Sequence, residues 1–129
     1  MTRTIVLGVA AATALMAAGA AQAAGALGGD PVKGEAVFKT QCAACHSVKP
    51  GQDGAAPSLH GVVGRISGSE PGFAYTPAIK GAHIAWTPSK LDQFLSGPAK
   101  LIPGTAMPIT LPDPTQRHDV IAYLATLHK

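Results

Sequence analysis

The sequence predicts a small all-α domain of about four helices joined by long loops. A hydrogen-bonding cap residue followed by proline recurs along the chain, and this pair is typical of helix starts. No segment alternates apolar and polar residues over the length of a strand. The cap–proline pairs are Asp30-Pro31, Thr76-Pro77, Thr87-Pro88 and Asp113-Pro114.

The first two predicted helices differ in length. The first is expected at about Pro31–Cys42, with Val37 and Phe38 on an apolar face. The second is short, at about Pro77–Lys80. Between them, Lys49–Gly72 is rich in glycine and proline, which predicts a long loop. A loop of this length in a compact domain usually surrounds a functional site.

The third helix is predicted at Pro88–Ser96. Its Leu91, Phe94 and Leu95 follow the i, i+3, i+4 spacing of a buried stripe. Gly97-Pro98 is expected to end it and to begin a second long loop, Gly97–Pro112.

The last helix is predicted at about Pro114–His128. Asp113 and Gln116 have the spacing of a capping box at its start. Its buried face is expected to hold Val120, Ile121, Leu124 and Leu127.

The N-terminal residues resemble a secretory signal. Arg3 is followed by an apolar run from Ile5 to about Ala18, and then by the small-x-small triplet Ala21-Gln22-Ala23. The run is shorter than the roughly 20 residues of a membrane span. We therefore expect residues 1–23 to be a cleaved signal peptide and residues 24–129 to form one domain. Cleavage after Ala20 or Ala24, or an uncleaved membrane anchor, are the alternatives.

Charge and composition exclude a nucleic-acid-binding protein. The signal holds one of the ten Lys and Arg and none of the seven acidic residues, so the mature chain is only mildly basic at +2. Nucleic-acid binding needs a strong basic patch. Only three Phe, two Tyr and one Trp are present. A chain this small and poor in aromatic residues gains stability from a cofactor.

Cys42-Ala43-Ala44-Cys45-His46 is the pattern of covalent haem attachment. Two thiols three residues apart on one helical turn lie on the same side and can form thioethers with the two haem vinyl groups. The histidine that follows can then coordinate the iron through a neutral imidazole.

Three other interpretations of the two cysteines are weaker. A thioredoxin-type pair expects a βαβ pattern, which is not seen. A plain disulfide does not require His46. A zinc site needs four suitably spaced ligands, whereas the other histidines are scattered: His60, His83, His118 and His128.

Met107 is the candidate for the second axial ligand of the iron. Met1 and Met16 fall in the signal, whereas Met107 lies in a loop stiffened by Pro103 and Pro108. A filled position favours electron transfer, and an open one permits ligand binding. His60 or His83 could compete as ligands, although surface positions are favoured for them.

Nearly the whole mature chain, Gly34 to Leu127, resembles a class I cytochrome c of the mitochondrial or alphaproteobacterial type. The resemblance covers an ordered set of motifs. They are Gly34-x-x-x-Phe38-x-x-x-Cys42, Ala56-Pro57-Ser58-Leu59-His60-Gly61, Gly64-Arg65, Gly72-Phe73-Ala74-Tyr75-Thr76, Trp86, Ile102-Pro103-Gly104-Thr105-x-Met107 and Asp119-Val120-Ile121-Ala122-Tyr123-Leu124.

This resemblance implies a cytochrome c fold around one covalent haem c, with His46 and Met107 as iron ligands. The Pro57 carbonyl would accept from the second nitrogen of His46. Thr105 would lie beside Met107. Arg65, Tyr75 and Trp86 would surround the haem propionates. Gly34 and Phe38 would pack against Val120 and Tyr123 where the first and last helices cross.

The chain departs from the family pattern on the Met107 side. Phe94 replaces a common tyrosine and Ile79 a common buried asparagine, so this side is expected to be drier and less polar. Ala99 and Ala106 stand where mitochondrial members have lysines. Electrostatic attraction to an acidic partner should therefore be weaker, although Lys49 and Lys100 are present.

The expected function is periplasmic electron transfer by a monomeric carrier that is not an enzyme and is not inserted in the membrane after cleavage. Its transient partners would be a membrane cytochrome complex, an oxidase or an exported dehydrogenase. Two alternatives stand beside it. One is a dedicated haem subunit of an exported dehydrogenase, and the other is a peroxidase or ligand-binding haem protein if Met107 does not coordinate the iron.

Overall fold

The computed structural model describes residues 27–128, so the predicted signal peptide lies outside the described residues. This part of the chain forms five helices and no named strand, and an isolated antiparallel bridge joins Ile66 to Ala85. The all-α prediction is confirmed. The helices are α1 (Pro31–Gln41), α2 (Pro77–Ala82), α3 (Pro88–Ser96), α4 (Pro98–Leu101) and α5 (Pro114–Thr126).

All four predicted cap–proline pairs begin a helix. In each case the side-chain oxygen of the cap accepts a hydrogen bond from an N–H of the first turn, and proline occupies the position after it. The caps are Asp30, Thr76, Thr87 and Asp113. Local capping chemistry therefore determines where these helices start.

Three details differ from the prediction. Asp113 accepts from the N–H of Thr115 and not of Gln116, so the predicted capping box is not formed. The last helix ends at Thr126, two residues before the predicted end. Gly97 ends α3 as expected, but Pro98 also opens the short helix α4, which the sequence did not reveal because Gly97 has no side chain to cap it.

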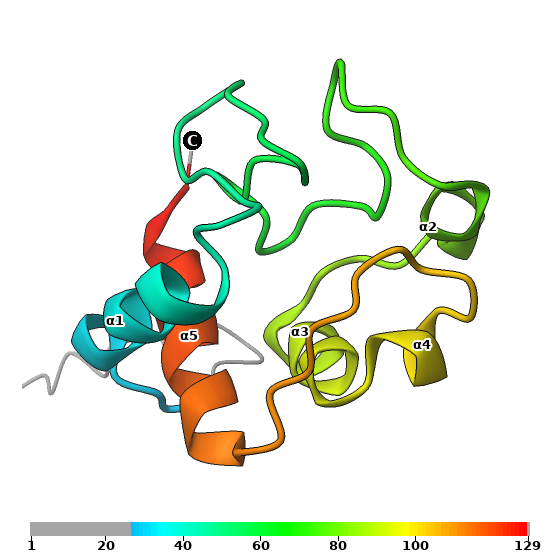
Figure 1. Cartoon of the computed structure of the whole chain (residues 1–129). Coiled ribbons are helices and arrows are strands. Elements are labelled where there is room, and N and C mark those ends of the chain that lie inside the picture. Colours follow the sequence, from blue (N-terminus) through cyan, green and yellow to red (C-terminus); the bar gives the residue numbers. More distant parts are fainter. Residues whose placement is uncertain (1–26, 129) are drawn as a thin grey trace, which may run out of the picture.

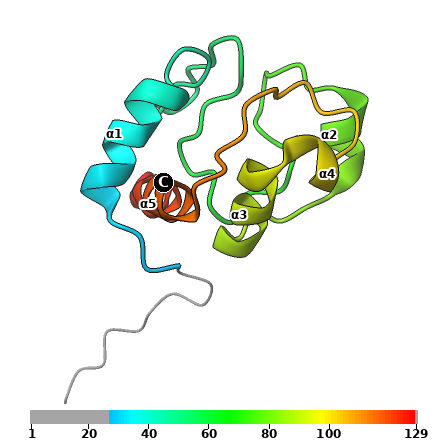
Figure 2. The same cartoon turned by 60° about the horizontal axis from the view of Figure 1, so that its bottom comes forward.

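Helices α1 and α5 cross in direct contact, although they lie at opposite ends of the sequence. In Figure 2, α5 is seen nearly end-on while α1 runs across the view. Gly34 faces the backbone of Asp119 and the side chain of Tyr123, and the rings of Phe38 and Tyr123 are 5.7 Å apart. The predicted crossing of the first and last helices is thus found.

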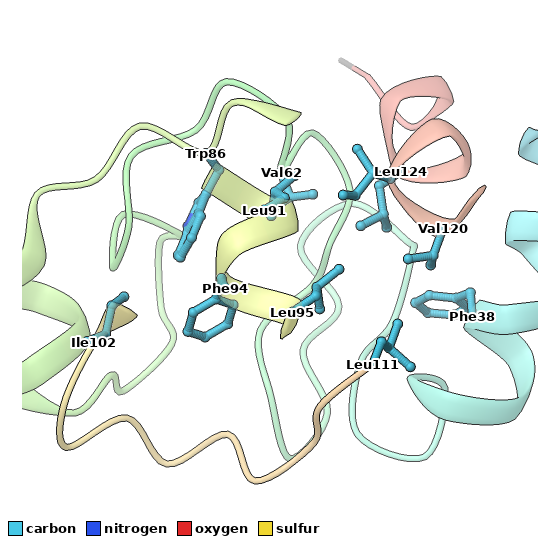
Figure 3. Close-up of a cluster of buried hydrophobic side chains, with 11 residues drawn as sticks. Phe38, Val62, Trp86, Leu91, Phe94, Leu95, Ile102, Leu111, Val120 and Leu124 are labelled. Carbon is cyan, nitrogen blue, oxygen red and sulfur yellow. The ribbon is translucent and has the colours of Figure 1, made fainter. Parts of the chain in front are cut away.

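Helices α3 and α4 form the other side of the molecule, and α3 also contacts α5 (Figure 1). The buried side chains come from both sides and face one another across the interior (Figure 3). Trp86 and Phe94 pack together with ring centroids 5.0 Å apart. The core residues are Phe38, Val62, Trp86, Leu91, Phe94, Leu95, Ile102, Leu111, Val120, Ile121 and Leu124.

Candidate cofactor site

A cavity of about 480 Å³ lies between the two sides of the molecule. Its volume falls within the range of about 300 to 1,000 Å³ that is typical of ligand and cofactor pockets. Most of the wall is apolar, and it is built from helices and loops that are far apart in the sequence. Among the residues that line it are Leu59, Val62, Ile79, Leu91, Phe94, Leu95, Ile109, Val120 and Leu124.

The two cysteines and His46 lie on a tight turn that follows α1. The helix ends at Gln41, one residue before the predicted end, so Cys42 caps the helix instead of belonging to it. The N–H groups of Cys45 and His46 both donate to the Cys42 carbonyl, at 3.1 and 2.9 Å. All three side chains consequently line the cavity.

The two thiols differ in exposure. Cys42 is half-buried and Cys45 is exposed, and neither forms a disulfide. Burial raises the pKa of the Cys42 thiol to about 11. Because neither thiol is used in a disulfide and both line the cavity, both would be available to form thioether bonds to a cofactor there.

His46 is oriented by a single backbone group. Its Nδ1 lies 2.7 Å from the Pro57 carbonyl oxygen, the contact that the resemblance implied. Because a carbonyl only accepts, Nδ1 carries the hydrogen and Nε2 keeps its lone pair. Burial lowers the pKa of His46, and the Arg65 charge adds to this effect against the opposing influence of the Pro57 carbonyl. The imidazole is thus held neutral, which is the form that binds a metal.

The loop that carries Pro57 is fastened on both sides of the proline. The Ala56 N–H donates to the Cys45 carbonyl at 3.0 Å. Ser58 is fully buried, and its hydroxyl donates to the Lys49 carbonyl at 2.7 Å. The Ser58 N–H donates to the Asp53 carboxylate at 2.8 Å. These bonds fix the carbonyl that orients His46.

Met107 lines the same cavity from the loop that follows α4. Its N–H donates to the Thr105 hydroxyl oxygen at 3.4 Å, so Thr105 lies beside it as expected. Gly104 has a φ of +87°, a conformation that other residues rarely adopt, and it turns the loop toward the cavity. Ile79 and Phe94 also line the wall, which makes it apolar.

The three residues expected around the propionates also line the cavity: Arg65, Tyr75 and Trp86. Arg65 donates to the carbonyl oxygens of Ser58 and His60, at 3.0 and 3.3 Å. Burial raises the pKa of the Tyr75 hydroxyl. Arg65 and Tyr75 both retain N–H or O–H donors beyond the bonds they make here.

Sequence reasoning missed Glu70. Its carboxylate lies 2.8 Å from the Arg65 guanidinium, and both side chains are largely buried. The only signal in the sequence is a lone acidic residue in a loop of glycine, serine and proline, five residues after Arg65.

The other histidines lie away from the site. His60, His83, His118 and His128 do not line the cavity, which leaves His46 as its one histidine within residues 27–128. In the same part of the chain, no three His, Cys, Asp or Glu side chains cluster as a metal site would require.

The donor set fits a covalently bound haem. The two thiols on one turn suit the two vinyl groups of an iron porphyrin, and the neutral imidazole and the thioether from another loop suit its iron. The cation and the phenol at the edge of the apolar cavity suit its two carboxylate groups. The fold and the site together define a haem protein of the covalent type.

Comparison with known proteins gives the family. The Cytochrome c family model matches residues 31–128, and the chain belongs to the cytochrome c family. It is an electron carrier and not an enzyme, and its cofactor is a covalently attached haem c. No helix within residues 27–128 is long and apolar enough to cross a membrane.

Several known proteins are similar to this chain over most of their length. Cytochrome c2 of Rhodopila globiformis is 48% identical over 77% of this chain and 94% of its own. Cytochrome c2 of Rhodomicrobium vannielii is 48% identical over 78% and 81%. The solved structure of cytochrome cH from Methylobacterium extorquens superposes with a TM-score of 0.71 at 39% identity, covering 76% of this chain and 99% of that one.

Proposed function

We propose that this chain is a periplasmic one-electron shuttle in which His46 and Met107 fill both axial positions of the haem iron. The observation that carries the proposal is the hydrogen bond from His46 to Pro57, because it leaves Nε2 free in a cavity that Met107 also lines. Cys42 and Cys45 hold the haem covalently.

The haem supplies an iron that accepts and returns one electron. The chain's part is to hold that iron closed to other ligands and to set its potential. His46 stays neutral because it is buried, and Pro57 fixes the plane of its ring. A thioether ligand from Met107 raises the reduction potential. The apolar wall excludes water from the site.

The polar residues of the cavity are proposed to bind the haem propionates. Arg65 and Tyr75 offer N–H and O–H donors, and the buried Trp86 lines the same cavity. Buried carboxylates need such partners. Thr105 holds the backbone of Met107 in place through its hydroxyl oxygen.

The proposed location is the periplasm, and the proposed domain is 24–129 after removal of a signal at 1–23. The charged, apolar and small-residue pattern at the N-terminus supports export. The carrier would act as a monomer, and its docking with a membrane cytochrome complex, an oxidase or an exported dehydrogenase would bury a small area for a short time.

The test compares Met107→Ala with Ile109→Ala, a matched change in the same loop and cavity. The ferric protein and the Ile109→Ala variant should show the near-infrared absorption band of methionine–iron bonding, and Met107→Ala should lose it and bind cyanide much faster. A wild-type protein without this band, which binds cyanide quickly at neutral pH, would support the ligand-binding alternative. Stable copurification with a dehydrogenase would support the subunit alternative.

A further inference from the structure

Glu70 is a buried acid that the proposed function does not use. It is 8% exposed, and acidic residues are seldom this buried unless they are paired. Its carboxylate accepts from Arg65 at 2.8 Å, and the side chains of the two residues are 7% and 11% exposed. The pair is therefore sheltered from solvent and from screening by salt.

Glu70 stands behind Arg65 as seen from the cavity. Arg65 lines the cavity, whereas Glu70 does not. The other partners of the guanidinium are the neutral carbonyls of Ser58 and His60. Among these partners Glu70 alone carries a charge, so it is the direct partner that offsets the positive charge that Arg65 presents to the cavity.

Glu70 also contacts Tyr75, another polar residue of the cavity. Its backbone N–H donates to the Tyr75 hydroxyl oxygen at 3.2 Å. This acceptance leaves the Tyr75 O–H hydrogen available as a donor. Glu70 thus contacts both Arg65 and Tyr75, two of the cavity side chains that can donate to a carboxylate.

The loop around Glu70 has little room to move. Gly68 has a φ of +71°, and a Cβ there would lie 2.9 Å from the Lys80 Cα. The Ser69 hydroxyl donates to the Ile66 carbonyl at 2.6 Å, and the Ser67 N–H donates to the Ile84 carbonyl at 2.7 Å. These contacts fix the backbone that leads into Glu70, whose carboxylate is bound by Arg65.

We propose that Glu70 is a positioning residue for the electron-transfer reaction. Glu70 orients Arg65 and Tyr75 toward the haem and lowers the reduction potential of the haem. A carboxylate behind the guanidinium makes the site less positive, and a less positive site favours the ferric iron. The proposal rests on the haem assignment and does not depend on Met107 being a ligand.

The test is the reduction potential of the holoprotein with Glu70→Gln, compared with Glu35→Gln. Glu35 is a partly exposed acid on α1 that pairs with Lys39, so its change removes the same charge at a distance from the cavity. At a fixed solution potential, Glu70→Gln should raise the ferrous-to-ferric ratio three- to tenfold. This equals a rise of about 30 to 60 mV in the reduction potential, because a tenfold change corresponds to about 59 mV for one electron. Glu35→Gln should shift it less than twofold. A fall in potential, or equal shifts in both variants, would overturn the proposal.

A second comparison asks whether Glu70 acts through Arg65. In an Arg65→Gln background, Glu70→Gln should shift the ratio by less than half as much, because the part of the shift that comes through the oriented guanidinium is lost and only the direct effect of the carboxylate charge remains. An equal shift in both backgrounds would mean that Glu70 acts as an independent charge, which contradicts a positioning role.

A third variant keeps the proposal testable if Glu70→Gln does not fold. Glu70→Asp retains the charge but is one methylene shorter, so it should loosen the contact with Arg65. Hydrogen exchange of the Arg65 side-chain N–H groups, followed by NMR on the ferrous protein, should become faster than in wild type. Unchanged exchange together with an unchanged potential would refute the role. A normal methionine–iron band in these variants separates this outcome from a failure of the axial-ligand proposal.

Discussion

Gly34 lies where α1 packs directly against α5, and replacing it by alanine should separate the two helices. A Cβ built at Gly34 would lie 2.9 Å from the Tyr123 Cβ and closer still to the Asp119 carbonyl group. Real Cβ atoms do not approach backbone atoms this closely. Because the Asp119 carbonyl belongs to a helix, neither contact can be relieved by a side-chain rotation.

The net cost can be worked from two opposing effects. Overpacking of a core contact costs about 1 to 3 kcal/mol, and sometimes more. Alanine in place of glycine inside a helix recovers about 0.5 to 1 kcal/mol. Since the contact is with rigid backbone, we expect the upper end of the overpacking cost, and therefore a net loss of about 2 to 2.5 kcal/mol in the free energy of unfolding. This corresponds to a fall of about 10 to 20 °C in Tm for a domain of this size.

The assay is thermal and guanidinium unfolding of the ferric holoprotein, with Gly81→Ala as the matched control. Gly81 also lies inside a helix, α2, but a Cβ there would meet nothing within 4 Å. Gly81→Ala should leave stability unchanged or raise it by up to about 1 kcal/mol. If the two variants are equally stable, the close approach of α1 and α5 is not what requires glycine at position 34.

Three further predictions concern charged or titratable side chains. Arg117→Gln should lower the free energy of unfolding by about 2 to 3 kcal/mol, measured with denaturant, because it breaks a largely buried pair with Asp92 at 2.7 Å. Lys39→Gln breaks an exposed pair with Glu35 and should change nothing measurable, so equal effects of the two variants would contradict the argument. Ala106→Lys should speed electron transfer with an acidic partner at low salt and leave the rate at high salt unchanged; a gain that persists at high salt would point to a non-electrostatic cause. The proposed iron bond occupies Nε2 of His46, and burial also lowers the pKa of this side chain, so the folded protein takes up no proton there. The unfolded chain binds one below the usual histidine pKa of about 6.5, so the free energy of unfolding should fall below that pH; greater stability in denaturant unfolding at pH 5 than at pH 7.5 would refute this sign.

The helix starts could be predicted because each depends on two adjacent residues. Asp30, Thr76 and Thr87 are followed by proline, and each caps the helix that begins there. The start of α4 could not be found in this way, because Gly97 has no side-chain cap and looked only like the end of α3. The predicted ends of α1 and α5 differ from the observed ends by one and two residues, because no single residue determines where these helices stop.

The site was predictable where one local motif carries the chemistry. Cys42, Cys45 and His46 are adjacent in sequence, and the turn that holds them places all three at one cavity. Glu70 could not be predicted because its role depends on contacts with Arg65 and Tyr75 across a loop without periodicity. The full burial of Ser58 was hidden for the same reason: its partners come from the folded loop and not from neighbouring residues.

The crossing of α1 and α5 also constrains the order in which contacts form as the chain folds. The carboxylate of Asp119 on α5 accepts from the N–H of Asp30, which lies 89 residues earlier and caps α1. Contacts between such distant segments form late, because the intervening chain must first be closed into a loop. The helix that leads into Cys42 and Cys45 therefore cannot be covered by its partner until α5 has been synthesised. The segment that carries the two thiols reaches its final packing only when both ends of the domain are present.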